Sequence, residues 1–153
     1  LHVRPRYPLL PWEWAGATPD IVIPSAVAST EAIAWSESPA YNRIFVAGQE
    51  QGRMGQITRA GTAGDLVAPM VTDPLITHAD AARARGASIL AAGGRQATVA
   101  LRLPVLPATG ILDIGQLVEY QDGATARRGL VRAVSVEAGL PNVWQTVEIE
   151  THA

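Results

Sequence analysis

The period of apolar residues changes in the middle of the chain, at Gly93 and Gly94. Before these glycines, Ala and other small apolar residues recur every three to four positions, which predicts one helix over Thr77–Ala92. Thr77 is the expected N-cap, because its hydroxyl can accept from the backbone N–H of Asp80. The two glycines are expected to end the helix, since Gly adopts the left-handed conformation found after many helices.

The apolar face of this predicted helix consists of small residues, including Ala82 and Gly86. Such a face lets another backbone approach closely, so it suits packing on a sheet or on a neighbouring subunit. We therefore predict Ala82 and Gly86 as contact residues of a subunit or of the N-terminal segment.

The period becomes two after the glycines. Four apolar residues share one side of the next segment: Ala97, Val99, Leu101 and Leu103. This alternation predicts a half-buried strand. Other strand signals lie at Tyr41–Ala47, Gln56–Ala60, Gln116–Gln121, Gly129–Glu137 and Val143–Thr151. The spacing predicts a mainly β fold with one inserted helix, in which residues 41–153 form a small antiparallel β-barrel.

Residues 1–40 differ from this pattern and are predicted to be an extended arm or interdomain segment. Six of the 11 prolines and three of the 4 tryptophans lie here. Proline disfavours long helices and central strands, whereas tryptophan favours burial. We therefore expect Trp12, Trp14 and Trp35 to pack on the barrel or on another subunit.

Composition limits the possible functions. The 153 residues carry a net charge of −2, and all twelve basic residues are Arg, so no global basic field attracts nucleic acid or a membrane. There is no Cys, and no apolar run approaches the length of a membrane span. The chain begins at Leu1 rather than Met, so we expect it to be a fragment or a processed product of a larger protein.

Candidate chemistry is sparse. The loop Arg59–Asp65 resembles a phosphate loop in its glycines, but it lacks the Lys-Ser/Thr ending and is better explained as a turn. The three histidines are far apart in the sequence, and Glu148 with Glu150 reads as a solvated strand face. Arg127, Arg128 and Arg132 form a small basic cluster that we expect to pair with acidic residues across an interface. We therefore predict no enzyme activity, no catalytic residues, no cofactor and no metal.

Several stretches, in order along most of the chain, resemble the late-control D type of tail hub (baseplate hub) proteins in Mu-like bacteriophages. The stretches that carry the resemblance are Arg6-Tyr7-Pro8 with Pro11-Trp12 and Trp14, Tyr41-Asn42-Arg43 leading to Gly48, Arg59–Asp65, Ala68–Thr77, Arg85-Gly86, Leu103-Pro104, Gly129-Leu130-Val131 and Glu150-Thr151-His152.

This resemblance implies a structural, non-enzymatic protein. It implies that the full-length protein is a homotrimer in the virion, at the tail tip or baseplate, after assembly in the host cytoplasm. The resemblance also implies two barrels in each subunit, so that the six barrels of a trimer match the six subunits of a tail-tube ring. The implied partners are the tail tube protein and the distal tail, tip or central fibre proteins, without a membrane or a specific nucleic acid. The alternative is a β-barrel module that binds carbohydrate or nucleic acid, or a lytic accessory domain.

Overall fold

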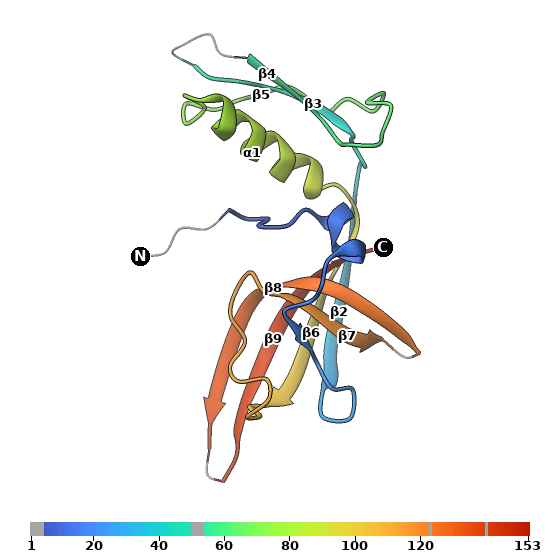
Figure 1. Cartoon of the computed structure of the whole chain (residues 1–153), viewed down its shortest axis with the longest axis vertical. Helices are drawn as coiled ribbons and strands as arrows, with labels where there is room; N and C mark the ends of the chain where they lie inside the picture. Colours follow the sequence, from blue (N-terminus) through green and yellow to red (C-terminus); the bar gives the residue numbers. More distant parts are fainter. Residues whose placement is uncertain (1–4, 50–53, 123, 140) are drawn as a thin grey trace. The chain divides into compact units, whose positions relative to one another are not determined.

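The computed structural model of the chain describes residues 5–49, 54–122, 124–139 and 141–153. The elements in chain order are the 3-10 helix η1 (Pro11–Gly16), β1 (Ile21–Val22), β2 (Ser29–Ser38), β3 (Arg43–Ala47), β4 (Met54–Thr58), β5 (Val71–Thr72), α1 (Ala79–Ala91), β6 (Gly94–Pro104), β7 (Leu117–Asp122), β8 (Thr125–Ala138) and β9 (Val143–His152) (Figure 1). The mainly β fold is confirmed, as is an α-helix close to the predicted position.

The chain forms two compact units, each built from two separate segments. The helical unit consists of Glu37–Arg95 together with the segment that ends at Leu10. The sheet unit consists of Pro11–Ser36 and Gln96–Ala153. The predicted division into residues 1–40 and 41–153 stays a prediction about domains, but residues 11–38 supply a 3-10 helix and two strands.

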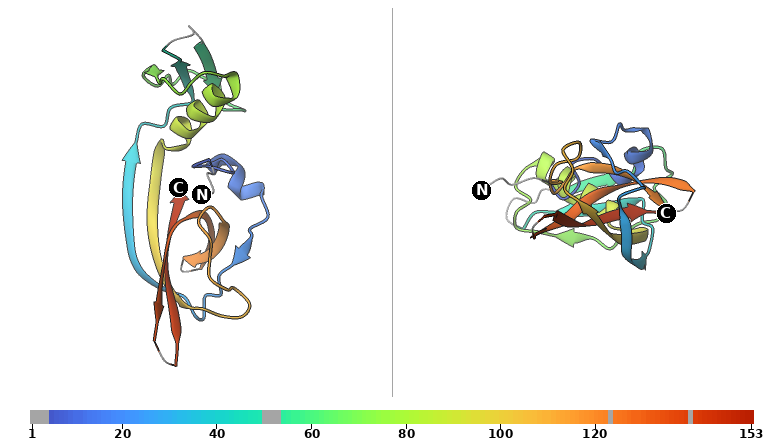
Figure 2. Two further views of the ribbon diagram at one scale, coloured as in Figure 1. Left: turned by 90° about the vertical axis from the view of Figure 1, so that its left-hand side faces the viewer. Right: turned by 90° about the horizontal axis from the view of Figure 1, so that it is seen from below.

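The sheet unit is built on one curved sheet with the strand order β1-β7-β8-β9-β6-β2 (Figures 1 and 2). The four alternating apolar residues of β6 are all buried, as predicted, and they pair along β9 from Thr151 to Gln145. Val118, Val131 and Ile149 from the neighbouring strands complete much of this core. Alternation thus places one face of every central strand in the interior.

The helical unit is smaller and combines α1 with the three-stranded sheet β4-β3-β5. Ile44 and Val46 of β3 are buried, and β3 pairs antiparallel with β4 as the predicted hairpin requires. Gly86 of α1 lies against Ile57 of β4, because a Cβ on Gly86 would come within 2.8 Å of that side chain. The small helix face therefore packs on a sheet of the same chain.

The barrel prediction is wrong. Closure requires the two end strands of a sheet to pair with each other, but the six-stranded sheet ends at β1 and β2. β1 has two residues and, among the described strands, pairs only with β7, in parallel. Strands β3, β4 and β5 form a separate sheet that α1 covers, so residues 41–153 do not make one β layer.

Two further expectations change at the local level. The N-cap of α1 is His78 rather than Thr77, and its ring nitrogen Nδ1 accepts from the backbone N–H of Asp80 at 3.3 Å. The sequence pattern did not predict β2, a ten-residue strand that is exposed along its whole length. Because neither side of β2 is buried, its sequence lacks the contrast between apolar and polar positions that reveals a strand.

Candidate assembly surfaces

The segment Pro11–Ser36, which we call the Trp-bearing segment, packs on the sheet through Trp14, which is 3% exposed. Its indole meets the ring of His152 edge to face, with 5.2 Å between the ring centroids. Trp12 is half-buried, and Trp35 on β2 is 47% exposed. The three tryptophans thus have different environments, and their predicted role as subunit contacts stays a prediction.

Arg128 holds the end of η1 on the sheet. Its Nη1 donates to the backbone carbonyls of Trp14, Ala15 and Ala17 at 3.1, 2.7 and 2.9 Å. Its Nε donates to Oε2 of Glu119 at 2.9 Å. A cation at the C-terminal end of a helical turn satisfies carbonyls that have no partner within the helix.

A second, partly buried ion pair lies beside this anchor. Arg132 Nε donates to Glu150 Oε2 at 2.7 Å, and Glu150 Oε1 lies 3.1 Å from Nε2 of His152. Glu150 is 7% exposed, so the expectation of a solvated carboxylate is wrong at this position. Arg128 and Arg132 pair within the chain, which corrects the expectation that they pair across an interface.

The face of the sheet opposite the core carries a polar cluster around Arg102 of β6. Its guanidinium lies 3.0 Å from Glu137 and 3.9 Å from Glu31, and its carbon Cζ lies 5.3 Å from the centroid of the Trp144 ring. The cluster links β2, β6, β8 and β9 on a surface that remains accessible to solvent. Its ion pairs are exposed and contribute little stability, so its main effect is on the polarity of this face.

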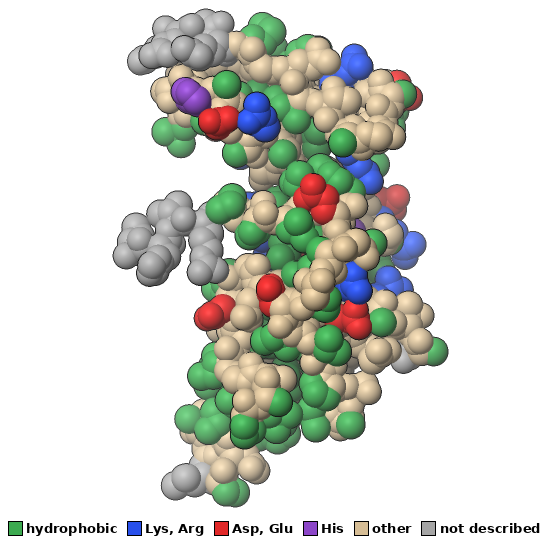
Figure 3. Space-filling model, in the orientation of Figure 1, with side chains coloured by type: hydrophobic (Ala, Val, Ile, Leu, Met, Phe, Trp, Pro, Cys, Tyr) green, Lys and Arg blue, Asp and Glu red, His purple; other side chains and the backbone are tan. Residues whose placement is uncertain are grey.

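One end of the sheet unit carries exposed apolar side chains, which we call the hairpin-end patch. Its members are Ile111, Ile114, Val136 and Val143, which are 56%, 60%, 44% and 40% exposed. The buried Gln145 of β9 connects the loop between β6 and β7 to the hairpin of β8 and β9. Its side chain accepts from the backbone N–H of Leu112 and donates to the carbonyl of Gly110. Apolar side chains gather at this end in the space-filling view (Figure 3). Clustered apolar exposure of this kind marks contact surfaces.

Ala82 and Gly86, the other predicted contacts, are buried against β4 in the helical unit. Their small size serves the packing of α1 on its own sheet. The subunit contact predicted for them gains no support from this arrangement.

The loop Arg59–Asp65 is a turn that depends on Gly conformations, as expected. Gly61 and Gly64 have φ angles of 75° and 68°. A hydrogen bond from the Asn42 side chain at 2.8 Å lowers the pKa of Asp65, with smaller contributions from backbone N–H donors and from Arg43. The carboxylate therefore fastens the loop to the start of β3.

Within the described residues, no three His, Asp or Glu side chains converge as metal ligands would. No helix in this part of the chain is both long and apolar enough to span a membrane.

The architecture has a counterpart among solved structures. A 43 kDa tail protein of prophage MuSo2 from Shewanella oneidensis superposes with a TM-score of 0.50 at 14% identity, over 84% of this chain and 42% of that protein. The fold resembles that of a prophage tail protein. No family model and no curated protein matches the sequence.

Two weaker likenesses concern a tail protein from Neisseria meningitidis MC58 and a chain in the virion of a native gene transfer agent particle. Their TM-scores are 0.44 and 0.45, at 10% and 16% identity, over 88% of this chain in both cases. They cover 45% and 32% of those chains. This chain therefore spans less than half the length of each of these three solved chains.

Proposed function

We propose that the chain is part of a structural protein in the tail of a bacteriophage or of a tail-derived particle. The observation that carries this proposal is the likeness in fold to the prophage tail protein over 84% of the chain. The resemblance of several stretches to late-control D type hub proteins supports the same class of protein. Because both supports concern tail proteins and neither includes catalytic residues, the proposal is for a structural role and includes no catalytic activity.

The finer proposal is a ring-forming hub that links the tail tube to the tail tip or baseplate. In it, the full-length protein is a homotrimer that contacts the tube protein and the tip or central fibre proteins. The hairpin-end patch and the face around Arg102 are the surfaces best suited to such contacts. An apolar patch gains about 25 cal/mol for each Å² that is buried, and a closed ring repeats this gain at every interface.

The experiment for the tail role is deletion of the gene that encodes the protein, followed by electron microscopy of the particles produced. We expect heads without complete tails, and restoration of tails when the gene is supplied again. Normal tails that lack the protein by mass spectrometry would rule the tail role out.

The homotrimer is tested separately by the mass of the full-length protein in solution. We expect three copies, and Ile114→Asp with Val136→Asp to weaken the assembly while leaving the circular dichroism spectrum unchanged. An unchanged mass in this double variant would show that the hairpin-end patch is not the interface.

The alternative, a module that binds carbohydrate or nucleic acid, finds less support. It needs exposed aromatic rings as stacking platforms on a strand face. Tyr120 is buried, and the Arg102 guanidinium lies over the ring of Trp144. Among the aromatic side chains that the structure describes, Trp35 is the one classed as exposed, at 47%, and one exposed ring is a small platform for such a ligand.

A further inference from the structure

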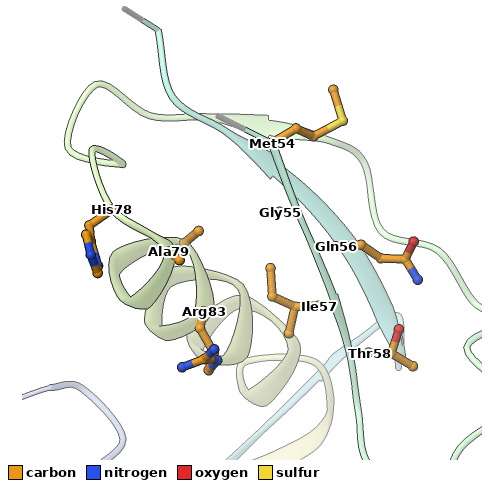
Figure 4. A pocket seen from close by; sticks show the side chains of 9 residues that line it. Met54, Gly55, Gln56, Ile57, Thr58, His78, Ala79 and Arg83 are labelled. Atoms are coloured by element: carbon orange, nitrogen blue, oxygen red, sulfur yellow. The ribbon is translucent and has the colours of Figure 1, made fainter. Parts of the chain in front are cut away.

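A groove in the helical unit runs between β4 and α1. The whole of β4 lines one side, and His78, Ala79, Ala82 and Arg83 line the other. Its volume is about 480 Å³. Figure 4 shows that Ile57 points toward the helix, whereas Gln56 and Thr58 point away from it.

The backbone of β4 pairs with β3 on one edge only. Among the described strands, β4 ends the three-stranded sheet. The hydrogen bond from the Arg59 N–H to the Asn42 carbonyl, at 2.8 Å, fixes the phase of the antiparallel pairing. Because inward and outward bonding alternate along such a strand, Gly55 and Ile57 bond to β3. Met54, Gln56 and Thr58 therefore direct their N–H and C=O groups to the open edge.

Hydrogen bonds on the other side of β3, away from β4, independently support this assignment of which residues bond to β3 and which face the open edge. The N–H of Arg43 donates to the Leu66 carbonyl at 3.1 Å, and its own carbonyl accepts from Ala68 at 2.7 Å. Arg43 is opposite Thr58 in the register, so neither residue of this pair uses its backbone to hold the other. The backbone groups of Thr58 are thus available for another strand.

The groove also has a charge preference. Among the described residues that line the groove, Arg83 is the one with a formal charge at neutral pH. Its ion pair with Asp80 is 2.9 Å long, but the two side chains are 72% and 73% exposed. An exposed pair of this kind contributes little stability, so a carboxylate from outside can replace Asp80 as the partner of Arg83.

We propose that this groove receives an extended segment of a separate partner protein, which adds a strand to β4 and directs a carboxylate toward Arg83. Strand addition of this kind takes its affinity from the main chain and its specificity from alternate side chains. Here the alternate side chains that face α1 must be small or apolar, because Ala79, Ala82 and Ile57 form that wall. The inference goes beyond the tail role and does not depend on it.

A second copy of this chain is a poorer occupant. Every described strand of five or more residues already belongs to a sheet, so a second copy would bring a whole sheet to the open edge of β4 beside α1. β2, the most exposed of them, is hydrogen-bonded to β6. A separate protein with an unpaired extended segment brings a single strand to this edge.

The test uses the full 153-residue chain and blocked hexapeptides of alternating valine and threonine, with a glutamate at one end or the other. Binding is measured by calorimetry. We expect saturable binding by at least one peptide, and at least tenfold weaker binding when lysine replaces its glutamate. Arg83→Gln should remove this preference for glutamate.

Backbone pairing is tested by Gln56→Pro, which removes an N–H that faces the open edge and leaves the pairing with β3 intact. Gln56→Ala is the matched control, since it shortens the same side chain but keeps the N–H. We expect at least tenfold weaker binding for Gln56→Pro, an unchanged affinity for Gln56→Ala, and unchanged circular dichroism for both.

The peptide offers a complementary test. N-methylation of alternate amides should abolish binding in one frame and spare it in the other, because an added strand pairs through every second residue. No binding at millimolar concentration, or equal tolerance of both frames, would overturn the proposal. Self-association of the chain that Gln56→Pro abolishes would overturn the choice of a separate partner in favour of a second copy.

Discussion

The two units hold a short helix on a sheet in different ways. In the helical unit, α1 approaches β4 through the absence of a side chain at Gly86, so the contact is apolar and depends on shape. In the sheet unit, η1 is held by the guanidinium of Arg128, so the contact is polar and depends on directed hydrogen bonds. The close packing at Gly86 is disrupted by added side-chain volume, whereas the contact made by Arg128 is disrupted by loss of its hydrogen-bond donors. The two contacts should therefore respond to different substitutions.

The largest effect is expected where added volume meets backbone in the sheet unit. A Cβ on Gly129 of β8 would fall on the carbonyl of Glu150, which the pairing of β8 with β9 holds in place. We expect Gly129→Ala to lower the free energy of unfolding by about 3 kcal/mol, measured by urea denaturation. Gly16→Ala is the control, since nothing lies within 4 Å of its added Cβ. Equal stability of the two variants would contradict this account.

The next effect concerns the polar anchor. Arg128→Met keeps most of the side-chain volume but removes the donors to Glu119 and to three carbonyls, which should cost about 2 kcal/mol. Hydrogen exchange over residues 11–17 should rise in this variant. Arg128→Lys should recover only part of the loss, because one ammonium group cannot serve both sides of the contact. Unchanged exchange in Arg128→Met would show that Trp14 alone holds η1.

A smaller effect is expected where added volume meets a side chain that can be shortened. Ala in a helix is normally about 1 kcal/mol more favourable than Gly, but at position 86 the new methyl would lie 2.8 Å from Ile57. We expect Gly86→Ala to be destabilising by about 1 kcal/mol. Removing the obstacle with Ile57→Ala should restore the usual advantage of Ala. A double-mutant cycle measures this coupling, and additive effects would show that the two residues do not interfere.

The smallest effect is expected at the loop of the helical unit. The hydrogen bond from Asn42 is the main cause that keeps the pKa of Asp65 below its ordinary value. A carboxyl with a lowered folded pKa stabilises the fold above its unfolded pKa of about 3.9, and this contribution is lost as the pH falls through the folded pKa. Asn42→Ala should therefore raise the pKa of Asp65 toward its ordinary value in an NMR titration. An unchanged titration would show that the backbone donors suffice.

The sequence predicted those elements whose side chains alternate between two environments. β6 is the clearest example, because its apolar residues face the core and its other residues face outward. β2 could not be predicted in this way, since all ten of its residues are exposed. The barrel prediction failed for a related reason: strand patterns reveal which face is buried but not whether the two end strands of a sheet meet.

The contact residues show a similar division. Ala82 and Gly86 could be recognised as a close-packing face, but a helix pattern does not state which surface it meets. Arg128 binds the backbone carbonyls of residues more than a hundred positions earlier. Because every residue has a backbone carbonyl, the sequence does not indicate which carbonyls Arg128 binds. The groove beside β4 depends on which edge of a hairpin stays open, and that is a property of topology alone.

The interleaving of the two units has a consequence for synthesis on the ribosome. Pro11–Ser36 belongs to the sheet unit, but the rest of that unit begins only at Gln96. The Trp-bearing segment must therefore remain without its sheet while residues 37–95 are made. Contacts between residues far apart in the chain form slowly, and apolar surface exposed in the meantime promotes aggregation. The nascent chain thus passes through a stage in which the helical unit can fold while Arg128, which binds the carbonyl of Trp14, has not yet been synthesised.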